Sequence, residues 1–240
     1  MKRTVILFVA MLLMAGNAMA GRTYVLIAGV SNYSDTSANL STTTSVCKDL
    51  QRVMEQHSND VSLLTSRYAN HDKIMEMLNR IAQAANADDR IIFFFSGHGS
   101  EGCLVPYDLK PLYYTEVIDA LSQSKAREKM VFVEACMSGS AIENVPQDWR
   151  EKLAQSGTVF ILSSRADEYS YGQELLKAGW FSHAFMKAIR GMADKDADRN
   201  ITVMELFTYV YNDVVNRSKN TQHPQLIATK EHRNDVVVAW

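Results

Sequence analysis

Apolar residues along the chain alternate between short runs and longer stretches with helical spacing. The short runs predict strands at 24–30, 61–65, 91–95, 130–134 and 158–162, with closing strands at 226–229 and 236–239. Between them, apolar residues three and four positions apart predict helices over 46–56, 72–87, 115–121, 181–189 and 201–215. The polar stretch 145–156 predicts a loop with a short helix, and 101–108 a hairpin or loop. This alternation favours one mostly parallel sheet with helices on both faces.

The first 20 residues have the layout of a secretory signal peptide. Lys2 and Arg3 form a basic start, an apolar run of about 11 residues follows, and Ala18-Met19-Ala20 is a small-x-small cleavage site. Such a run is too short to span a bilayer. We therefore expect a periplasmic or secreted protein with no membrane attachment after signal removal, and residues 21–240 as a single domain.

Composition narrows the classes of partner. Without the signal, 23 Lys and Arg stand against 27 Asp and Glu, a net charge of −4. This balance gives no electrostatic reason to expect nucleic acid or anionic lipid as a partner. The sequence carries no signal for an oligomeric state.

Two of the predicted strands end in residues that can perform nucleophilic catalysis. The strand 91–95 is followed by SGHGS and the strand 130–133 by EAC, which puts His98 and Cys136 at strand ends. Ligands of parallel sheets bind at the carboxyl ends of strands, where an imidazole can manage the proton of a thiol nucleophile. The backbone amides of Gly99 and Cys136 are candidate oxyanion donors. The alternatives are an inert buried cysteine and a simple turn.

The sequence resembles the caspase-like cysteine peptidases, the superfamily of caspases, metacaspases and legumains. FFFSGHGSEG resembles the strand end that carries the family's histidine, and VFVEACMSGS the one that carries its cysteine, in a form nearest to legumain. YVLIAGVSNY, LVPYD, GWFSHAFMKAIRG and HPQLI resemble bacterial caspase-domain proteins, so the resemblance spans nearly all of 21–240.

This resemblance implies a caspase-like three-layer α/β sandwich, with a mostly parallel sheet of about six strands. It implies a cysteine endopeptidase that acts on peptide or protein substrates through a thioester, with Cys136 as nucleophile and His98 as general base and acid, and with no required cofactor. Glu134 stands where metacaspases usually have Asp, and Met137 follows the cysteine in place of His. The caspase pattern of Gln before Ala-Cys-Arg-Gly is absent, which argues against cleavage after aspartate.

The residues expected around the substrate pocket carry opposite charges. Glu134 lies two positions before Cys136, so on a strand both side chains face one side, and its carboxylate could bind a P1 Arg or Lys. The loop after strand 158–162 supplies Ser163, Asp167 and Glu168 as further substrate-binding candidates by family position. Arg165 in that loop could instead pair with Glu134, which would suit asparagine as in legumain. We favour Arg or Lys, with three alternatives: an asparagine-specific peptidase, a catalytically silent binding module, and a Glu134 satisfied by local backbone amides.

A candidate calcium loop lies between the last two predicted helices. Asp194, Asp196, Asp198, Asn200 and Glu205 follow EF-hand ligand spacing, but Arg199 occupies the position where glycine permits a sharp turn. The alternative is a solvated acidic turn. The cysteines number three, so a Cys47–Cys103 bridge is a further open hypothesis, one that would spare Cys136.

Overall fold

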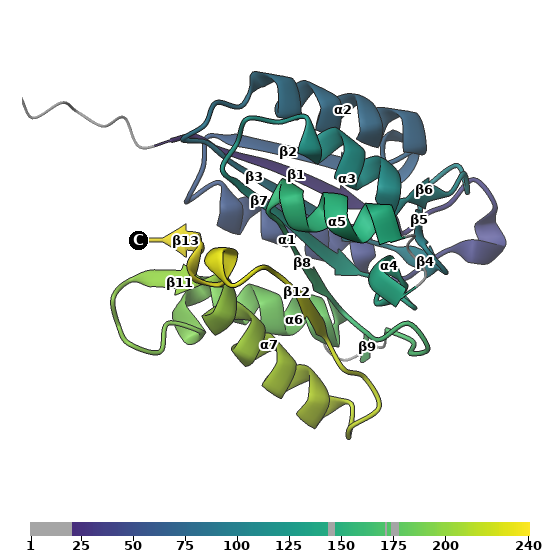
Figure 1. Ribbon diagram of the computed structural model, residues 1–240. Helices are drawn as coiled ribbons and strands as arrows, with labels where there is room; N and C mark the ends of the chain where they lie inside the picture. Colours follow the sequence, from purple (N-terminus) through teal and green to yellow (C-terminus); the bar gives the residue numbers. More distant parts are fainter. Residues whose placement is uncertain (1–20, 144–146, 171, 174–177) are drawn as a thin grey trace, which may run out of the picture.

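The computed structural model describes residues 21–143, 147–170, 172–173 and 178–240; the predicted signal peptide lies outside this part of the chain. A six-stranded sheet forms the centre of the molecule (Figure 1). Its strands pair in parallel except for the edge strand β12, which is antiparallel. In spatial order they are β12 (Gln225–Ile227), β8 (Thr158–Leu162), β7 (Glu128–Glu134), β3 (Arg90–Ser96), β1 (Thr23–Gly29) and β2 (Asp60–Thr65).

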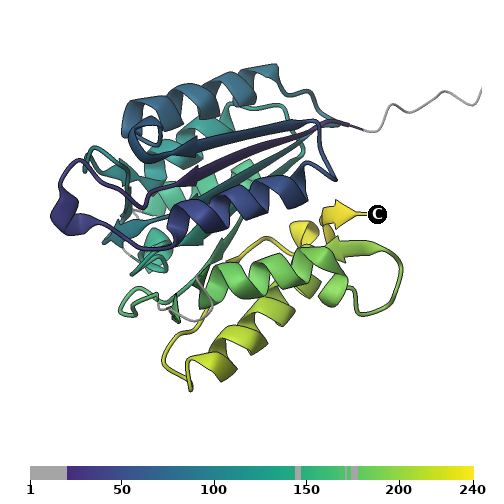
Figure 2. The ribbon, with the colours of Figure 1, turned by 180° about the vertical axis from the view of Figure 1, so that it is seen from behind.

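Helices cover both faces of this sheet, as the alternating pattern predicts (Figures 1 and 2). One face carries α2 (His71–Ala84), α3 (Tyr114–Ser122) and α5 (Gln147–Ser156), and the other α1 (Thr43–Met54), α6 (Trp180–Lys187) and α7 (Val203–Arg217). Successive residues of β3 alternate between the two cores: Phe93 and Phe95 pack on the first face, and Ile92 and Phe94 on the second. Burial on both faces explains why this strand is apolar throughout.

The strand order reverses between β1 and β3, and this reversal creates a crevice. From β1 the chain crosses through α1, on one face, to the edge strand β2, and returns through α2, on the other face, to β3. The loops after β1 and β3 therefore diverge at the carboxyl edge of the sheet, where open α/β folds bind their ligands.

Smaller elements are attached to this framework. A three-stranded sheet of β4 (His98–Ser100), β5 (Cys103–Val105) and β6 (Leu112–Tyr113) follows β3 directly. Two further ribbons pair β9 (Gly172–Gln173) with β10 (Ala178–Gly179), and β11 (Asn200–Thr202) with β13 (Val236–Ala239). The short helical segments are Thr36–Ala38, Ser66–Tyr68, α4 (Ser140–Glu143), Ala188–Met192 and Glu231–Asn234.

Three expectations differ from this architecture. Within 145–156, expected to be mostly loop, α5 takes up ten residues; it has few apolar positions because only Trp149 and Leu153, four apart, contact the core. Of the two expected closing strands, only β12 joins the main sheet, since β13 pairs with β11. All three cysteines are free, so the Cys47–Cys103 bridge is not formed. Within the described residues, no helix is long and apolar enough to cross a membrane.

Candidate active site

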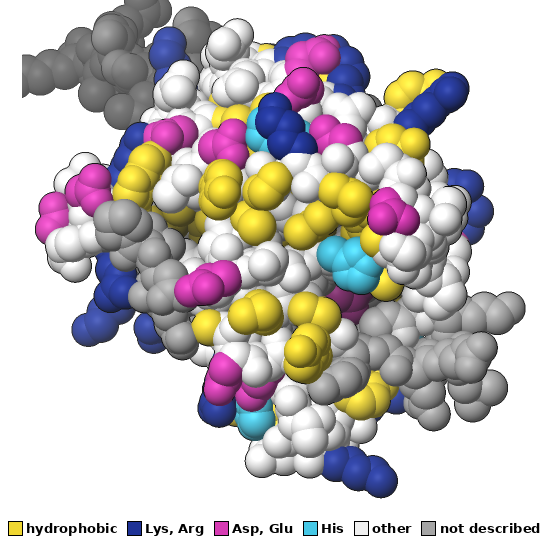
Figure 3. All heavy atoms as spheres, turned by 90° about the vertical axis from the view of Figure 1, so that its right-hand side faces the viewer, with side chains coloured by type: hydrophobic (Ala, Val, Ile, Leu, Met, Phe, Trp, Pro, Cys, Tyr) yellow, Lys and Arg dark blue, Asp and Glu magenta, His cyan; other side chains and the backbone are white. Residues whose placement is uncertain are grey.

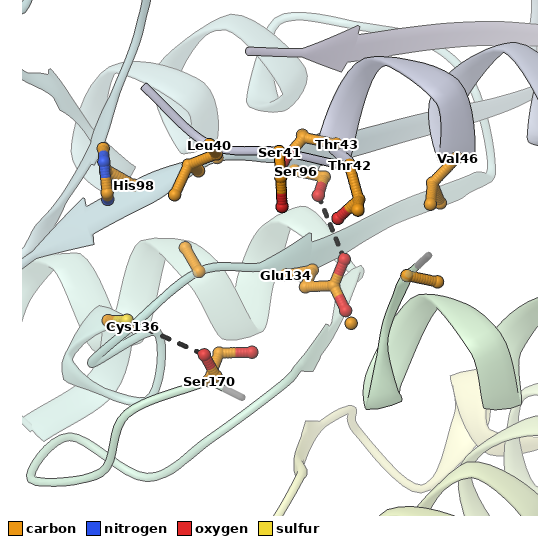
Figure 4. Close-up of a pocket in the computed structure, with 14 residues that line it drawn as sticks. Leu40, Ser41, Thr42, Thr43, Val46, Ser96, His98, Glu134, Cys136 and Ser170 are labelled. Carbon is orange, nitrogen blue, oxygen red and sulfur yellow. Dashed lines mark hydrogen bonds between the residues drawn. The ribbon is translucent and has the colours of Figure 1, made fainter. Parts of the chain in front are cut away.

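The register of two central strands brings the predicted dyad together. β3 and β7 pair in parallel with a constant offset of 38 residues, and Ser96 lies opposite Glu134 at their carboxyl ends. His98 and Cys136 are separated by the same offset, so each follows its strand by two residues at the same edge. Both line a pocket of about 450 Å³ (Figure 4).

Five stretches of the described chain line this pocket: the segment leading into α1, the ends of β3 and β7, the loop after β8, and β10 just before α6. Figure 4 shows His98 and Cys136 toward one end, Val46 at the other and Glu134 between them. The described lining residues are Leu40, Ser41, Thr42, Thr43, Val46, Ser96, Gly97, His98, Glu134, Ala135, Cys136, Ser170, Ala178 and Gly179. On the face that shows the carboxyl edge of the sheet, hydrophobic and acidic side chains gather in the middle, and most Lys and Arg lie at the margins (Figure 3).

A backbone carbonyl fixes the proton of the His98 ring. Nε2 lies 2.8 Å from the carbonyl oxygen of Ala38. A carbonyl only accepts hydrogen bonds, so Nε2 carries the proton and, in the neutral ring, Nδ1 has the free lone pair. This tautomer is inferred from the hydrogen-bond network. It leaves Nδ1 as the atom of His98 that can accept a proton.

Cys136 differs from the other two cysteines in its access to solvent. It is partly exposed, whereas Cys47 and Cys103 are buried. Burial, with a smaller effect from the charge of Glu134, raises the pKa of Cys47, which keeps that thiol protonated and inert. Met137 directly after Cys136 has φ of 54°, so the chain turns sharply as it leaves β7 and presents the thiol at the strand tip.

The backbones that follow β3 and β7 approach each other closely at Gly99. A Cβ added there would lie 2.5 Å from the carbonyl oxygen of Cys136, which only glycine avoids. The two predicted oxyanion donors, the amides of Gly99 and Cys136, therefore belong to neighbouring stretches of backbone. Their role in catalysis stays a prediction.

Glu134 lines the pocket and is also held from outside its own strand. Its carboxylate accepts hydrogen bonds from Ser96 Oγ at 3.0 Å, from the Ser182 backbone N–H at 2.9 Å and from Ser182 Oγ. Burial raises the pKa of Glu134, and the bonds from Ser182 and Ser96 oppose that rise. A Cβ on Gly179 would overlap its Oε1. The only backbone donor is the Ser182 amide on α6, 48 residues along the chain, and the other two donors are serine hydroxyls, so the expected local backbone amides are absent from the described contacts of Glu134.

The loop after β8 reaches the pocket through Ser170, but not through the three residues predicted to bind substrate there. Ser163 is buried and accepts the N–H of Ala135 through its hydroxyl at 3.1 Å, which ties β8 to the end of β7. Glu168 accepts hydrogen bonds from His223, at 2.7 Å from its backbone N and 2.6 Å from Nδ1. Asp167 is exposed. None of the three is among the described residues that line the pocket.

Arg165 does not neutralise Glu134. Its nearest acidic partner is Glu168, at 3.8 Å, and its side chain is about half exposed. Burial alone would raise the pKa of Glu168, but hydrogen bonds from His223 and from the Arg165 backbone lower it instead. The mixed-charge pocket formed by Arg165 and Glu134 is therefore absent from the described part of the chain.

The acidic loop shows part of an EF-hand geometry. Ligand atoms of Asp194, Asp196 and Asp198 lie within 4.8 Å of one another, and Asp194 Oδ1 is buried without a hydrogen-bond partner among the described residues. Arg199 has φ of 69°, the left-handed conformation expected of glycine, and its N–H donates to Asp194 Oδ2 at 3.1 Å. Glu205 is not part of the acidic cluster: its Oε2 caps α7 through Thr202, and its Oε1 accepts the Lys195 N–H at 3.2 Å.

Sequence comparisons relate the chain to the caspase domain and to legumains. The family model of the caspase domain matches residues 22–234. Legumain from Canavalia ensiformis is 36% identical over 93 residues, which cover 37% of this chain and 18% of the relative. A vacuolar-processing enzyme from Glycine max is 38% identical over 66 residues, which cover 25% of this chain and 13% of the relative. These matches thus cover less than a fifth of either relative's length.

Solved structures agree on the fold. Caspase-1 from Spodoptera frugiperda superimposes with a TM-score of 0.64 at 16% identity, over 87% of each chain. A protein from Geobacter sulfurreducens superimposes with a TM-score of 0.62 at 14% identity, over 91% of this chain and all of the other. The mostly parallel six-stranded sheet with helices on both faces is the caspase fold. The chain belongs to the caspase domain family and carries a caspase-like peptidase domain.

Proposed function

We propose that this protein is an exported cysteine endopeptidase that cleaves peptide bonds after Arg or Lys, with Cys136 as nucleophile and His98 as general base and acid. The observation that carries the proposal is the shared pocket: His98 and Cys136 line one cavity whose only other charged lining residue, in the described chain, is Glu134. A thiol, a proton acceptor and a carboxylate are the groups that this reaction requires.

The chemical steps follow from these positions. His98 Nδ1 accepts the thiol proton, and the sulfur of Cys136 attacks the scissile carbonyl carbon, which moves an electron pair onto the carbonyl oxygen. The amides of Gly99 and Cys136 stabilise that oxygen. The C–N bond then breaks as His98 donates its proton to the leaving amine, which leaves a thioester. Water, deprotonated by His98, hydrolyses the thioester and restores the thiol.

The polarity of the pocket supports a basic P1 residue. A P1 guanidinium or ammonium would find a carboxylate acceptor in Glu134, whereas a P1 aspartate would meet like charge. Arg165, which would have favoured an amide side chain, is paired with Glu168 instead. Asparagine specificity stays the second candidate, because a 93-residue segment resembles legumain.

A panel of fluorogenic peptides with Arg, Lys, Asn and Asp at P1 tests the proposal. We expect turnover of the Arg and Lys members, no detectable turnover of Asp, and no activity in Cys136→Ala. Preference for Asn would support the second candidate. If the folded wild-type protein turns over no member, while its thiol still reacts with iodoacetamide, a silent binding module becomes the better description.

We also propose that the loop 194–205 binds calcium through Asp194, Asp196 and Asp198. The buried, unpartnered Asp194 Oδ1 beside two further carboxylates supports this, since Ca²⁺ prefers oxygen ligands. The backbone carbonyl of Asn200 would be a further ligand, and Glu205 would join through Oε1, which now accepts the Lys195 N–H, while Oε2 keeps capping α7.

Calorimetry of the Cys136→Ala protein measures calcium binding without self-digestion. We expect saturable heat with Ca²⁺ but not Mg²⁺, and about 1.4 kcal/mol of stabilisation at ten times the Kd. Asp196→Asn combined with Asp198→Asn should remove both effects. No heat at millimolar Ca²⁺ would leave a solvated acidic turn as the correct interpretation.

A further inference from the structure

The loop between β1 and α1 holds His98 from two sides. Ala38 accepts the ring proton on Nε2, as described above. Tyr33, five residues earlier, accepts the backbone N–H of His98 on its hydroxyl at 2.7 Å, and the two rings lie 4.9 Å apart between centroids. Tyr33 is 3% exposed, so this contact is made inside the protein. The imidazole is thereby held through its ring and through its backbone.

The position of Tyr33 is itself tightly fixed. Its backbone N–H donates to Asn39 Oδ1 at 2.8 Å, and Val30 N–H donates to the Ser96 carbonyl at 3.0 Å, which ties the loop to the end of β3. A Cβ added to Gly97 would lie 2.8 Å from the Tyr33 hydroxyl. Glycine at 97 thus leaves the space that the phenol needs to reach the His98 amide.

We propose that Tyr33 is a positioning residue of the peptidase, which sets the place of the His98 imidazole and of the backbone that leads to Gly99. The inference rests on the proposed function, because it concerns the base of that reaction. The hydroxyl accepts the N–H between Gly97 and His98, so it fixes the peptide plane from which the ring projects. A small displacement of a catalytic base lowers kcat strongly, since proton transfer needs hydrogen-bond distance.

The phenol can act only as a neutral group. Burial raises the pKa of Tyr33, with the charge of Cys136 adding a smaller effect and the bond from His98 opposing it. The hydroxyl therefore keeps its proton throughout the neutral range and accepts the His98 N–H with an oxygen lone pair. Its effect on catalysis is accordingly geometric.

Tyr33→Phe tests this by removing one oxygen atom, and Tyr114→Phe is a matched control. The Tyr114 hydroxyl is also buried, but it has no hydrogen-bond partner among the described residues. We expect Tyr33→Phe to lower kcat on an Arg substrate about 10- to 100-fold, with KM changed less than about twofold, and Tyr114→Phe to change neither. Gly97→Ala, which would push the hydroxyl away while keeping the tyrosine, should lower kcat in the same way.

Alkylation of Cys136 by iodoacetamide supplies a second readout that needs no peptidase activity. We expect alkylation to be slower across the neutral pH range in Tyr33→Phe, because a displaced imidazole accepts the thiol proton less readily, with Cys136→Ala as the blank. A wild-type profile together with unchanged kcat would overturn the proposal; so would a loss confined to KM or to thermal stability. If the wild type cleaves no peptide, the alkylation profiles still decide the role of Tyr33.

Discussion

Replacing His98 by alanine is expected to lower kcat on an Arg substrate by about 10²- to 10⁴-fold while KM stays near its wild-type value. General acid–base catalysis by one positioned side chain typically contributes a factor of this size. The variant loses the atom that accepts the thiol proton and later protonates the leaving amine. Binding persists because Glu134 keeps its place through Ser96 and Ser182. Steady-state kinetics with the wild-type peptide measures both parameters.

His57→Ala is the matched control for this substitution. The His57 ring contacts the backbone carbonyl of Ala239, and His57 is not among the described residues that line the pocket. We expect its kinetics to match the wild type. If His98→Ala instead raises KM and spares kcat, His98 binds substrate and another group must manage the proton. Partial recovery of the His98→Ala rate by added imidazole would support the assigned role further.

The placement of His98 and Cys136 at one edge of the sheet could be predicted because both signals are local. β3 and β7 are apolar on two faces, so their ends are visible as the points where polar residues begin. The offset of 38 residues between them is then repeated by His98 and Cys136. Parallel pairing of neighbouring strands is enough to turn this spacing into proximity.

The contacts that shape the dyad and the pocket were not predictable in the same way. Ala38, Tyr33 and Ser182 act across distances of 60, 65 and 48 residues, and no periodic pattern marks a tyrosine that accepts a backbone N–H or a serine that holds a carboxylate. The loop after β8 shows how a prediction can also assign a residue to the pocket wrongly. Glu168 is an acidic residue in a loop that reaches the pocket, but its carboxylate is bound by His223, 55 residues later in the chain.

Glu134 offers a direct test of substrate choice. Glu134→Gln is expected to lower kcat/KM for the Arg peptide by about 30-fold or more, because losing one partner of a buried charged pair costs about 2–5 kcal/mol. The Asn peptide, which carries no charge, should lose much less. The variant should fold, since the amide oxygen of glutamine can still accept the Ser182 N–H and the serine hydroxyls can reorient.

The preference of the wild type for Arg over Asn should also depend on pH, because it relies on the charge of Glu134. Burial raises the pKa of Glu134, so its carboxylate protonates at a higher pH than an exposed glutamate. The charge that binds Arg is present above this raised pKa and is lost as pH falls through it. We therefore expect the Arg-to-Asn ratio of kcat/KM to fall on acidification in the wild type and to stay flat in Glu134→Gln.

Two further variants separate a pocket role for Glu134 from a purely structural one. Glu128→Gln changes a buried carboxylate at the other end of β7, where it pairs with Arg90 at 2.5 Å; stability should fall and the Arg-to-Asn ratio should not move. Gly179→Ala adds a Cβ that overlaps Glu134 Oε1, so the carboxylate must shift within the pocket. We expect kcat/KM to fall for the Arg peptide and to change little for the Asn peptide. Equal losses for both peptides in Glu134→Gln and Gly179→Ala would mean that Glu134 supports the fold of the site. A basic P1 side chain would then have to be recognised elsewhere, and the carboxylate next to the nucleophile would owe its position to the hydrogen bonds from Ser182 and Ser96 alone.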